Sequence, residues 1–372
     1  MVADQLKYRI AFASIRGMGY ELARQILEIV PSERDFFNMT RDELSSLLQV
    51  RSRIIDDDYR RRLLDSTEKE IEFIDKNNIG VTYFTDEDFP QRLANAPDAP
   101  ILLYHKGDVS CYNSGKAISI VGTRHATPYG THFCDTIVRD ISEQIADAVV
   151  VSGLAYGIDI AAHRAALSHG VPTIAVLAHG LNTIYPSQHR NDAIKILDEG
   201  GMLVTDYTSQ SVMSRGNFLA RNRIIAGLSD CTIVVESAEK GGAIVTAGIA
   251  SSYNRDVFAV PGKVSDIYSA GCNALIRKNT ASLITCCNDL MNAMRWEMIG
   301  DESVPRQRTL FPDITAEEQP VVDYLKSHSD VHINVLATTL GIPVAQLMSM
   351  LIDLEFKGAV LASPGNRYSS SF

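Results

Sequence analysis

Residues 117–130 read AISIVGTRHATPYG, a continuous apolar run that ends in a glycine turn and leads into a helical pattern. The same succession recurs along the middle of the chain. Apolar runs occur at 81–84, 117–122, 149–153, 173–180, 202–207, 231–237, 256–262 and 281–285, and helical patterns at 129–147, 157–169, 187–199, 217–228 and 243–254. Because the runs are apolar at successive positions, we expect strands buried on both faces. Strands that alternate with helices predict a mostly parallel, doubly wound α/β sheet.

Helical patterns flank this region on both sides. Residues 297–312 are polar, contain two prolines and are typical of a linker. After them come three helical patterns and then a Pro-Gly-Asn turn between two short extended pieces, which is typical of a winged helix. We therefore expect a helical domain at 1–78, a sheet domain at 79–296, a linker at 297–312 and a winged-helix-like domain at 313–372.

Composition narrows the class of protein. The chain has 372 residues, of which 45% are hydrophobic and 22% charged, and a formal charge of −10. No apolar run approaches the roughly 20 residues that cross a bilayer, and MVADQLKYRIAF at the N-terminus lacks a signal-peptide core. Six cysteines are too few for a disulfide framework. We expect a cytoplasmic, reduced protein that does not enter a membrane.

Glycines and cations follow three of the predicted strands. Ligands of doubly wound sheets bind beyond the ends of the strands, where glycine turns and helix N-termini suit anions. The turns match neither GxGxxG nor GxxxxGK[ST], so we expect neither a dinucleotide nor a P-loop site. Together these features predict a groove that binds phosphates. The alternative is that the glycines only form tight turns between strands and helices. The residues are Gly122, Thr123, Arg124, Ser152, Gly153, Lys240 and Gly242.

Residues 214–230, SRGNFLARNRIIAGLSD, contain several cations and an aromatic residue, with no acidic residue before Asp230. On a helix that begins near Asn217, Phe218 shares a face with the residues three and four positions later. Guanidinium groups bind phosphate and an exposed aromatic ring stacks on a base. A solvated helix with Phe218 in the core explains the pattern equally well. The candidates are Arg215, Phe218, Arg221, Asn222 and Arg223.

Catalytic and metal-binding patterns are weak. His163 has no Cys or His at a metal-ligand spacing and is expected to be a core histidine. Ser152 lacks the GxSxG pattern of a hydrolase nucleophile. We therefore expect no catalytic residues, no metal and no cofactor. The alternative is a nucleotide-phosphate-binding hydrolase that uses Asp159 or Glu236, although AEKGGAIVTAG has only part of the turn such enzymes carry.

Seven stretches over roughly residues 79–285 resemble, in family order, the DNA processing protein A (DprA/Smf) family. They are FPQRLANAPDAPILLYHKGD, ISIVGTRHATPYG, VVSGLAYGIDIAAH, GLNTIYPSQH, NFLARNRIIAGLSD, VVESAEKGGAIVTAGIA and VFAVPGKVSDIYSAGCNALI. The resemblance implies an extended Rossmann-like domain that binds single-stranded DNA and forms a homodimer. It also implies a mediator of natural transformation that protects incoming strands and helps load the RecA recombinase.

Carried over residue by residue, the resemblance implies a strand-binding pocket and assigns roles within it. Arg215 corresponds to the family's basic residue and Phe218 to its base-contacting aromatic, which favours stacking over a core position. The remaining pocket positions are Gly122, Arg124, Ser152, Gly153 and the Arg-Asn-Arg at 221–223.

The flanking regions resemble the family less specifically. Residues 1–78 resemble its helical N-terminal domain, of SAM or helix-hairpin-helix type, and IRGMG at 15–19 resembles a hairpin turn. Residues 313–372 contain three basic and seven acidic residues. Because duplex affinity depends largely on phosphate neutralisation, we expect this module to have a packing or protein-contact role.

Overall fold

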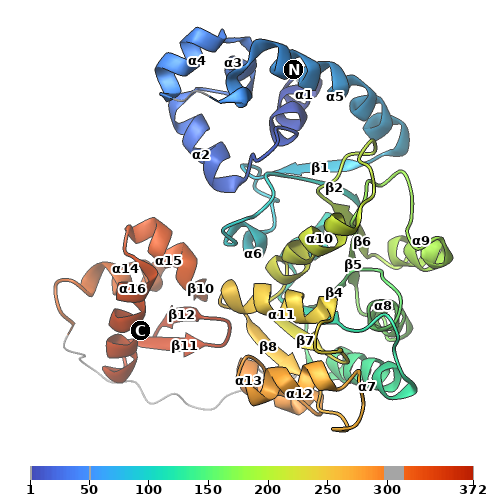
Figure 1. Cartoon of the computed structure of the whole chain (residues 1–372). Helices are drawn as coiled ribbons and strands as arrows, with labels where there is room; N and C mark the ends of the chain where they lie inside the picture. The colour runs from blue at the N-terminus through green and yellow to red at the C-terminus, as the bar shows by residue number, and fades with distance from the viewer. Residues whose placement is uncertain (1, 50–51, 297–313, 372) are drawn as a thin grey trace.

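The computed structural model describes residues 2–49, 52–296 and 314–371, and it has three parts in chain order (Figure 1). The predicted linker at 297–312 lies outside the described residues. The middle part contains a nine-stranded sheet. Its strands are β1 (Gly80–Tyr83), β2 (Leu102–Gly107), β3 (Lys116–Val121), β4 (Ala148–Ser152), β5 (Thr173–Val176), β6 (Met202–Thr205), β7 (Cys231–Val234), β8 (Asp256–Ala259) and β9 (Ser282–Leu283).

The strand order is β1-β2-β6-β5-β4-β3-β7-β8-β9. Strands β3 to β9 are parallel to one another, whereas β2 is antiparallel to both of its neighbours, β1 and β6. The order therefore runs outward in both directions from the β3–β7 pair, which confirms the predicted doubly wound, mostly parallel sheet. Each predicted apolar run overlaps a strand, but β2 was not predicted. Its antiparallel pairing with β1 and β6 depends on those partner strands and cannot be read from the residues of β2 alone.

Helices cover both faces of the sheet, which explains why the strand sequences are continuously apolar. In β3, Ile118 and Ile120 pack toward one face while Ala117 and Val121 pack toward the other. The first face carries α7 (Pro128–Gln144), α8 (Ile158–Ser168) and α13 (Cys287–Met294), with η3 (Ser187–His189) and α9 (Arg190–Asp198) farther along. The second carries α6 (Gln91–Ala94), η2 (Val109–Asn113), α10 (Arg215–Gly227), α11 (Gly242–Ser252) and α12 (Ala270–Arg277).

The N-terminal part is helical, as predicted. Its core includes Phe12 and Phe36, whose ring centroids are 5.3 Å apart, and it extends onto Tyr83 and Tyr104 of the β1–β2 pair. These helices therefore pack against the antiparallel edge of the sheet. They are α1 (Val2–Ala13), α2 (Tyr20–Ile29), α3 (Glu33–Asn38), α4 (Arg41–Leu48), η1 (Arg53–Ile55) and α5 (Asp57–Asn77).

The C-terminal part is a winged helix, which confirms the prediction of three helices and a hairpin. It comprises α14 (Gln319–Ser327), β10 (Val331–His332), α15 (Ile333–Leu340), α16 (Val344–Phe356), β11 (Val360–Ser363) and β12 (Arg367–Ser370), with the sheet order β10-β12-β11. The turn between β11 and β12 contacts the middle part. The Gly365 N–H donates to Asp256 Oδ2 at 2.6 Å, and Asn366 Nδ2 donates to the Asn254 carbonyl at 3.0 Å.

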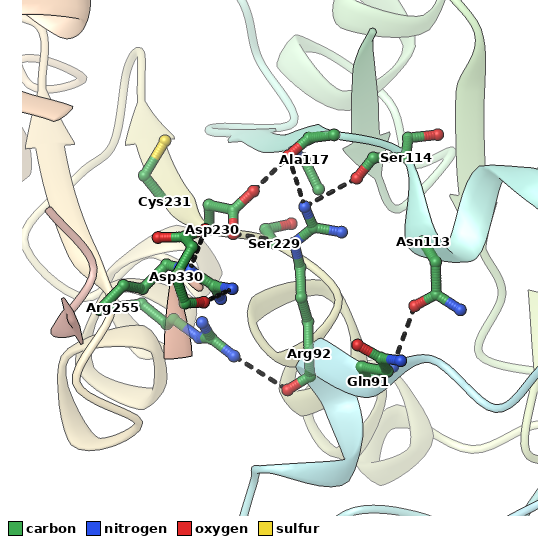
Figure 2. A network of polar contacts seen from close by, with 12 residues as sticks. Gln91, Arg92, Asn113, Ser114, Ala117, Ser229, Asp230, Cys231, Arg255 and Asp330 are labelled. Atoms are coloured by element: carbon green, nitrogen blue, oxygen red, sulfur yellow. Dashed lines mark hydrogen bonds and ion pairs between the residues drawn. The ribbon is translucent and has the colours of Figure 1, made fainter. Parts of the chain in front are cut away.

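A polar network lies beside this contact, where strands β3, β7 and β8 begin (Figure 2). Arg92 Nε lies 2.8 Å from Asp230 Oδ1, and the Ala117 N–H donates to Asp230 Oδ2 at 2.8 Å. Arg255 Nη2 donates to the Arg92 carbonyl at 2.9 Å. Burial acts to raise the pKa of Asp230. The Arg92 guanidinium, together with the Ala117 N–H and Arg255, outweighs burial and holds that pKa below its usual value. The contacts thus join α6 to the residues at which β3, β7 and β8 begin.

Among the described residues, no single helix has both the length and the apolar composition needed to cross a membrane. The consecutive helices α15 and α16 meet both criteria only when taken together, and they are bent by 112° at their junction. All six cysteines are free thiols.

Candidate nucleic-acid interface

A groove of about 810 Å³ opens at the opposite edge of the sheet, where β3 and β7 end. These two strands are neighbours at the point where the strand order reverses, which is where doubly wound sheets bind their ligands. The loop after β3, the loop after β7 and the first turns of α10 and α11 form its walls.

Two helices begin at this groove. Helix α10 starts at Arg215 and helix α11 at Gly242, and both residues line the groove. The Ser214 hydroxyl donates to Asn217 Oδ1 at 2.6 Å, and Gly241 has no side chain with which to cap the helix that follows it. The N-termini of both helices, where the positive ends of their dipoles lie, therefore border the groove. Such a pair of N-termini suits an anion.

Three exposed cations and an aromatic ring line the groove. Arg124, Arg215 and Lys240 line it, and within residues 2–49, 52–296 and 314–371 none of them forms an ion pair. The Arg124 guanidinium carbon lies 5.4 Å from the centroid of the Phe218 ring. Phe218 is half-buried and lies outside the hydrophobic clusters that the described residues form. This placement favours the stacking interpretation of Phe218 over the core interpretation.

Negative charge is scarce in the groove. Of the described residues that line it, Asp159 is the only acidic one, and it is 7% exposed at the start of α8. Burial raises the pKa of Asp159, while Arg221, the Ala155 N–H, Arg124 and the Gly122 N–H act in the opposite direction. The surface that a ligand meets is therefore dominated by cations and amides.

Arg221 lines the groove, and its hydrogen bonds in the structure go to protein atoms. It is 4% exposed, and its Nη1 donates to the Gly153 carbonyl at 2.7 Å and also to the Val176 carbonyl. Burial lowers its pKa to about 10. Because these hydrogen bonds point into the sheet, we no longer expect Arg221 to hold a phosphate directly. It instead ties α10 to the ends of β4 and β5, and Asn222 beside it is buried in the groove wall.

Three other predicted residues lie outside the groove lining. Ser152 is fully buried, with its hydroxyl donating to the Ile120 carbonyl at 2.6 Å. Gly153 lies against Arg221, since a Cβ there would come within 2.6 Å of the guanidinium carbon. Arg223 binds Asp206 at 2.5 Å, because five residues after Phe218 place it about 140° around the helix. These three positions serve the packing of the sheet and of α10.

The glycine turn after β3 has a packing role as well as a place in the groove. A Cβ on Gly122 would lie 2.4 Å from Ile158 Cγ1, so only glycine lets the loop meet α8. Thr123 shapes the same loop, because its N–H donates to the Glu236 carbonyl at 2.6 Å. Gly122 therefore packs against α8 and also lines the groove. At Gly242, which also lines the groove, a Cβ would meet nothing within 4 Å, so packing does not require a glycine there.

Glu236, a candidate catalytic residue of the enzymatic alternative, is buried and hydrogen-bonded within the protein. It is 1% exposed, and its two oxygens accept from the N–H and the hydroxyl of Thr127 at the start of α7. The described residues contain no group of three or more His, Cys, Asp or Glu side chains that could hold a metal ion. His163 is fully buried, as predicted, and its Nδ1 lies 2.8 Å from Thr173 Oγ1.

Several groove residues were not predicted. Tyr185 follows β5, whose end lies at the same edge, and its ring centroid is 5.6 Å from that of Phe218 at an interplanar angle of 64°. An aromatic residue beside a proline in a loop at the strand ends was the available signal. Leu219 and Val245, 48% and 44% exposed, also line the groove. Neither has a sequence feature that separates it from an ordinary helix position.

Comparison with known proteins places this geometry in context. Residues 80–295 match the family model described as DNA recombination-mediator protein A, and residues 305–366 match the DprA winged helix domain. Protein Smf of Escherichia coli (strain K12) is 32% identical over 315 residues, which are 82% of each chain. The X-ray structure of DNA processing protein A from Streptococcus pneumoniae is similar with a TM-score of 0.65 at 27% identity, over 77% of this chain and 95% of that one. A Helicobacter pylori structure, which concerns the single-stranded DNA binding mode of DNA processing protein A, has a TM-score of 0.51 at 30% identity and covers 57% and 94%.

Proposed function

Because the chain belongs to the DNA recombination-mediator protein A family, also named DprA or Smf, we propose that it binds single-stranded DNA in the groove where β3 and β7 end. Phe218 stacks on a base, and Arg124, Arg215 and Lys240 bind phosphates together with the N-termini of α10 and α11. The observation that carries this proposal is the meeting of three exposed cations, a half-buried aromatic ring and two helix N-termini in one groove.

A single strand fits this arrangement better than a duplex does. The Phe218 ring lies within the groove beside Tyr185, so a base must leave its pair to stack on it. In a duplex the faces of the bases are covered by their neighbours, and only the phosphates would reach the groove. The Helicobacter pylori relative, 30% identical, is described by its single-stranded DNA binding mode, which supports the same choice here.

The wider role follows from the family. We propose that the protein protects incoming single strands in natural transformation and helps to load the RecA recombinase on them. We further propose that it acts as a homodimer through the sheet domain. Family membership supports these steps, while the groove supports the DNA-binding step that precedes them.

Titration of labelled oligo-dT and of a duplex of equal length tests the DNA-binding step. We expect the wild type to prefer the single strand, and Arg124→Ala to weaken its binding and to reduce the slope of log affinity against log salt by about 0.7. Arg139→Ala is the control, because Arg139 lies on α7, is 47% exposed and does not line this groove. It should leave binding unchanged.

Two outcomes would overturn the proposal. One is equal affinity for single strand and duplex with no effect of Arg124→Ala. The other is hydrolysis of a nucleotide phosphate by the wild type that Asp159→Asn abolishes, since Asp159 is the acidic residue on the groove floor. The second result would favour the enzymatic alternative.

A further inference from the structure

A second groove, of about 730 Å³, lies between α7 and α8, on the other side of the loop that follows β3. Arg124 lines both this groove and the one that holds Phe218. We propose that the single strand continues from Phe218 across Arg124 into this second groove, where Tyr156 stacks on a further base. This inference rests on the proposed function, since it extends the path of the same strand.

A glycine lets the loop that separates the two grooves lie close against α8. Gly157 has φ +79°, and a Cβ there would lie 2.1 Å from the Thr123 carbonyl oxygen. The next residue, Ile158, donates its N–H to that same carbonyl at 3.1 Å. The loop is thus pressed onto the N-terminus of α8, with the exposed side chain of Arg124 at the crossing. A strand that passes over it keeps a phosphate contact between the two grooves.

The second groove combines an aromatic ring with a cation, as the first one does. Tyr156 is 39% exposed, its hydroxyl donates to Gln188 Oε1 at 2.8 Å, and its ring centroid lies 5.1 Å from that of His189. These contacts fix the ring while leaving part of it open, so that stacking costs little conformational entropy. The floor is apolar, which suits the face of a base: Ala126, Ile160, Ala161 and Ala165 line it.

The second groove carries both cations, which attract an anionic DNA strand, and one exposed carboxylate, Asp135, which repels it. Arg164 lines the groove and is 58% exposed, and its guanidinium holds Asp192 through two bonds of 2.9 and 3.0 Å. Asp135 also lines it and is 56% exposed, 2.9 Å from His169 Nε2. A strand that continues from Arg124 into this groove passes near the Asp135 carboxylate. Removal of the Asp135 charge should therefore strengthen binding of a strand that reaches the second groove.

The test measures the affinity of the full-length protein for oligo-dT of increasing length, from about 4 to about 16 nucleotides. Because a longer strand offers more binding registers, variants are compared with the wild type at each length. We expect Tyr156→Ala to weaken binding of the long strand roughly 5-fold or more, and to leave the short strand, which the first groove holds alone, unaffected. Asp135→Asn should raise affinity for the long strand only.

Matched controls guard against indirect effects. Tyr129→Ala removes an aromatic residue that is 50% exposed, and Asp198→Asn removes an exposed charge, while neither residue lines either groove. Both should bind like the wild type. The gain expected from Asp135→Asn cannot come from misfolding, so it tests the path even if Tyr156→Ala destabilises the protein.

The inference is wrong if Tyr156→Ala and Asp135→Asn leave affinity unchanged at every length, or if Tyr129→Ala weakens the long strand as much as Tyr156→Ala does. Failure of the proposed function would look different. In that case Arg124→Ala and Phe218→Ala would not weaken even the short strand, whatever the variants of the second groove do.

Discussion

Replacing Phe218 tests the role of the aromatic ring most directly. Base–aromatic stacking contributes about 1–3 kcal/mol, and the ring here is already held by Arg124 at 5.4 Å and by Tyr185 at 5.6 Å. Because little ordering remains to be done on binding, we expect Phe218→Ala to cost about 2 kcal/mol, or roughly 30-fold in affinity for oligo-dT. Fluorescence anisotropy at fixed salt measures this directly.

Two further variants separate stacking from simple apolar contact. Phe218→Tyr keeps the ring and should bind nearly as the wild type does, whereas Phe218→Leu keeps an apolar side chain without a π face and should lose most of the affinity. The free energy of unfolding should change little, because the cation–π contact with Arg124 at an exposed site contributes only about 0.5–1 kcal/mol. If Phe218→Ala and Phe218→Leu both bind oligo-dT as tightly as the wild type, the stacking argument fails.

Three other predictions concern the framework. Arg221→Met should lower the free energy of unfolding by about 3 kcal/mol in urea titration, because it orphans the Gly153 and Val176 carbonyls, and a loss of DNA affinity with unchanged stability would contradict this. Asp256→Ala should speed hydrogen exchange of the Gly365 amide about 5-fold, as expected for about 1 kcal/mol lost with one hydrogen bond, and unchanged protection would show that the contact is unimportant. Burial lowers the pKa of His163 to about 3 in the folded protein, from its ordinary value of 6.5. Between pH 6.5 and pH 3 the imidazole is therefore protonated in the unfolded chain but stays neutral in the folded protein. Stability is therefore complete above pH 6.5 and falls by about 1.4 kcal/mol per pH unit toward pH 3, and urea titrations should show a smaller fall in His163→Gln.

The middle of the fold was predictable because each strand carries its own signal. Ile118 and Ile120 face one layer of helices and Val121 the other, so burial on both sides makes the whole run apolar and distinct from an alternating strand. Strand β2, which lies between β1 and β6 and is antiparallel to both, has no such signal. Its residues face the N-terminal helices through Leu102 and Tyr104, and that partner is known only once the chain has folded.

The sequence predicted which residues lie near the groove, because the topology of the sheet determines that. It did not predict which way each side chain points. Gly122 and Arg124 follow β3 and lie in the groove because all parallel strands end at one edge. The sequence gives Arg221 and Arg223 the same chemistry as Arg124. Their carbonyl and carboxylate partners, which include Gly153 and Asp206, come from other strands and decide that both side chains bind protein atoms.

The two edges of the sheet are used for different purposes, and this limits what the winged helix can do. Its turn contacts Asp256 at the start of β8, whereas the groove lies where β3 and β7 end. Because the β-strands are parallel, these two positions lie at opposite ends of the strands. Bound DNA therefore need not displace the winged helix. The winged helix, held where it is, cannot cover Phe218. Loss of the Asp256 contact should accordingly leave affinity for oligo-dT unchanged. A change in that affinity on Asp256→Ala would mean that the two edges communicate through the sheet, and the winged helix would then have to be treated as part of the DNA-binding mechanism.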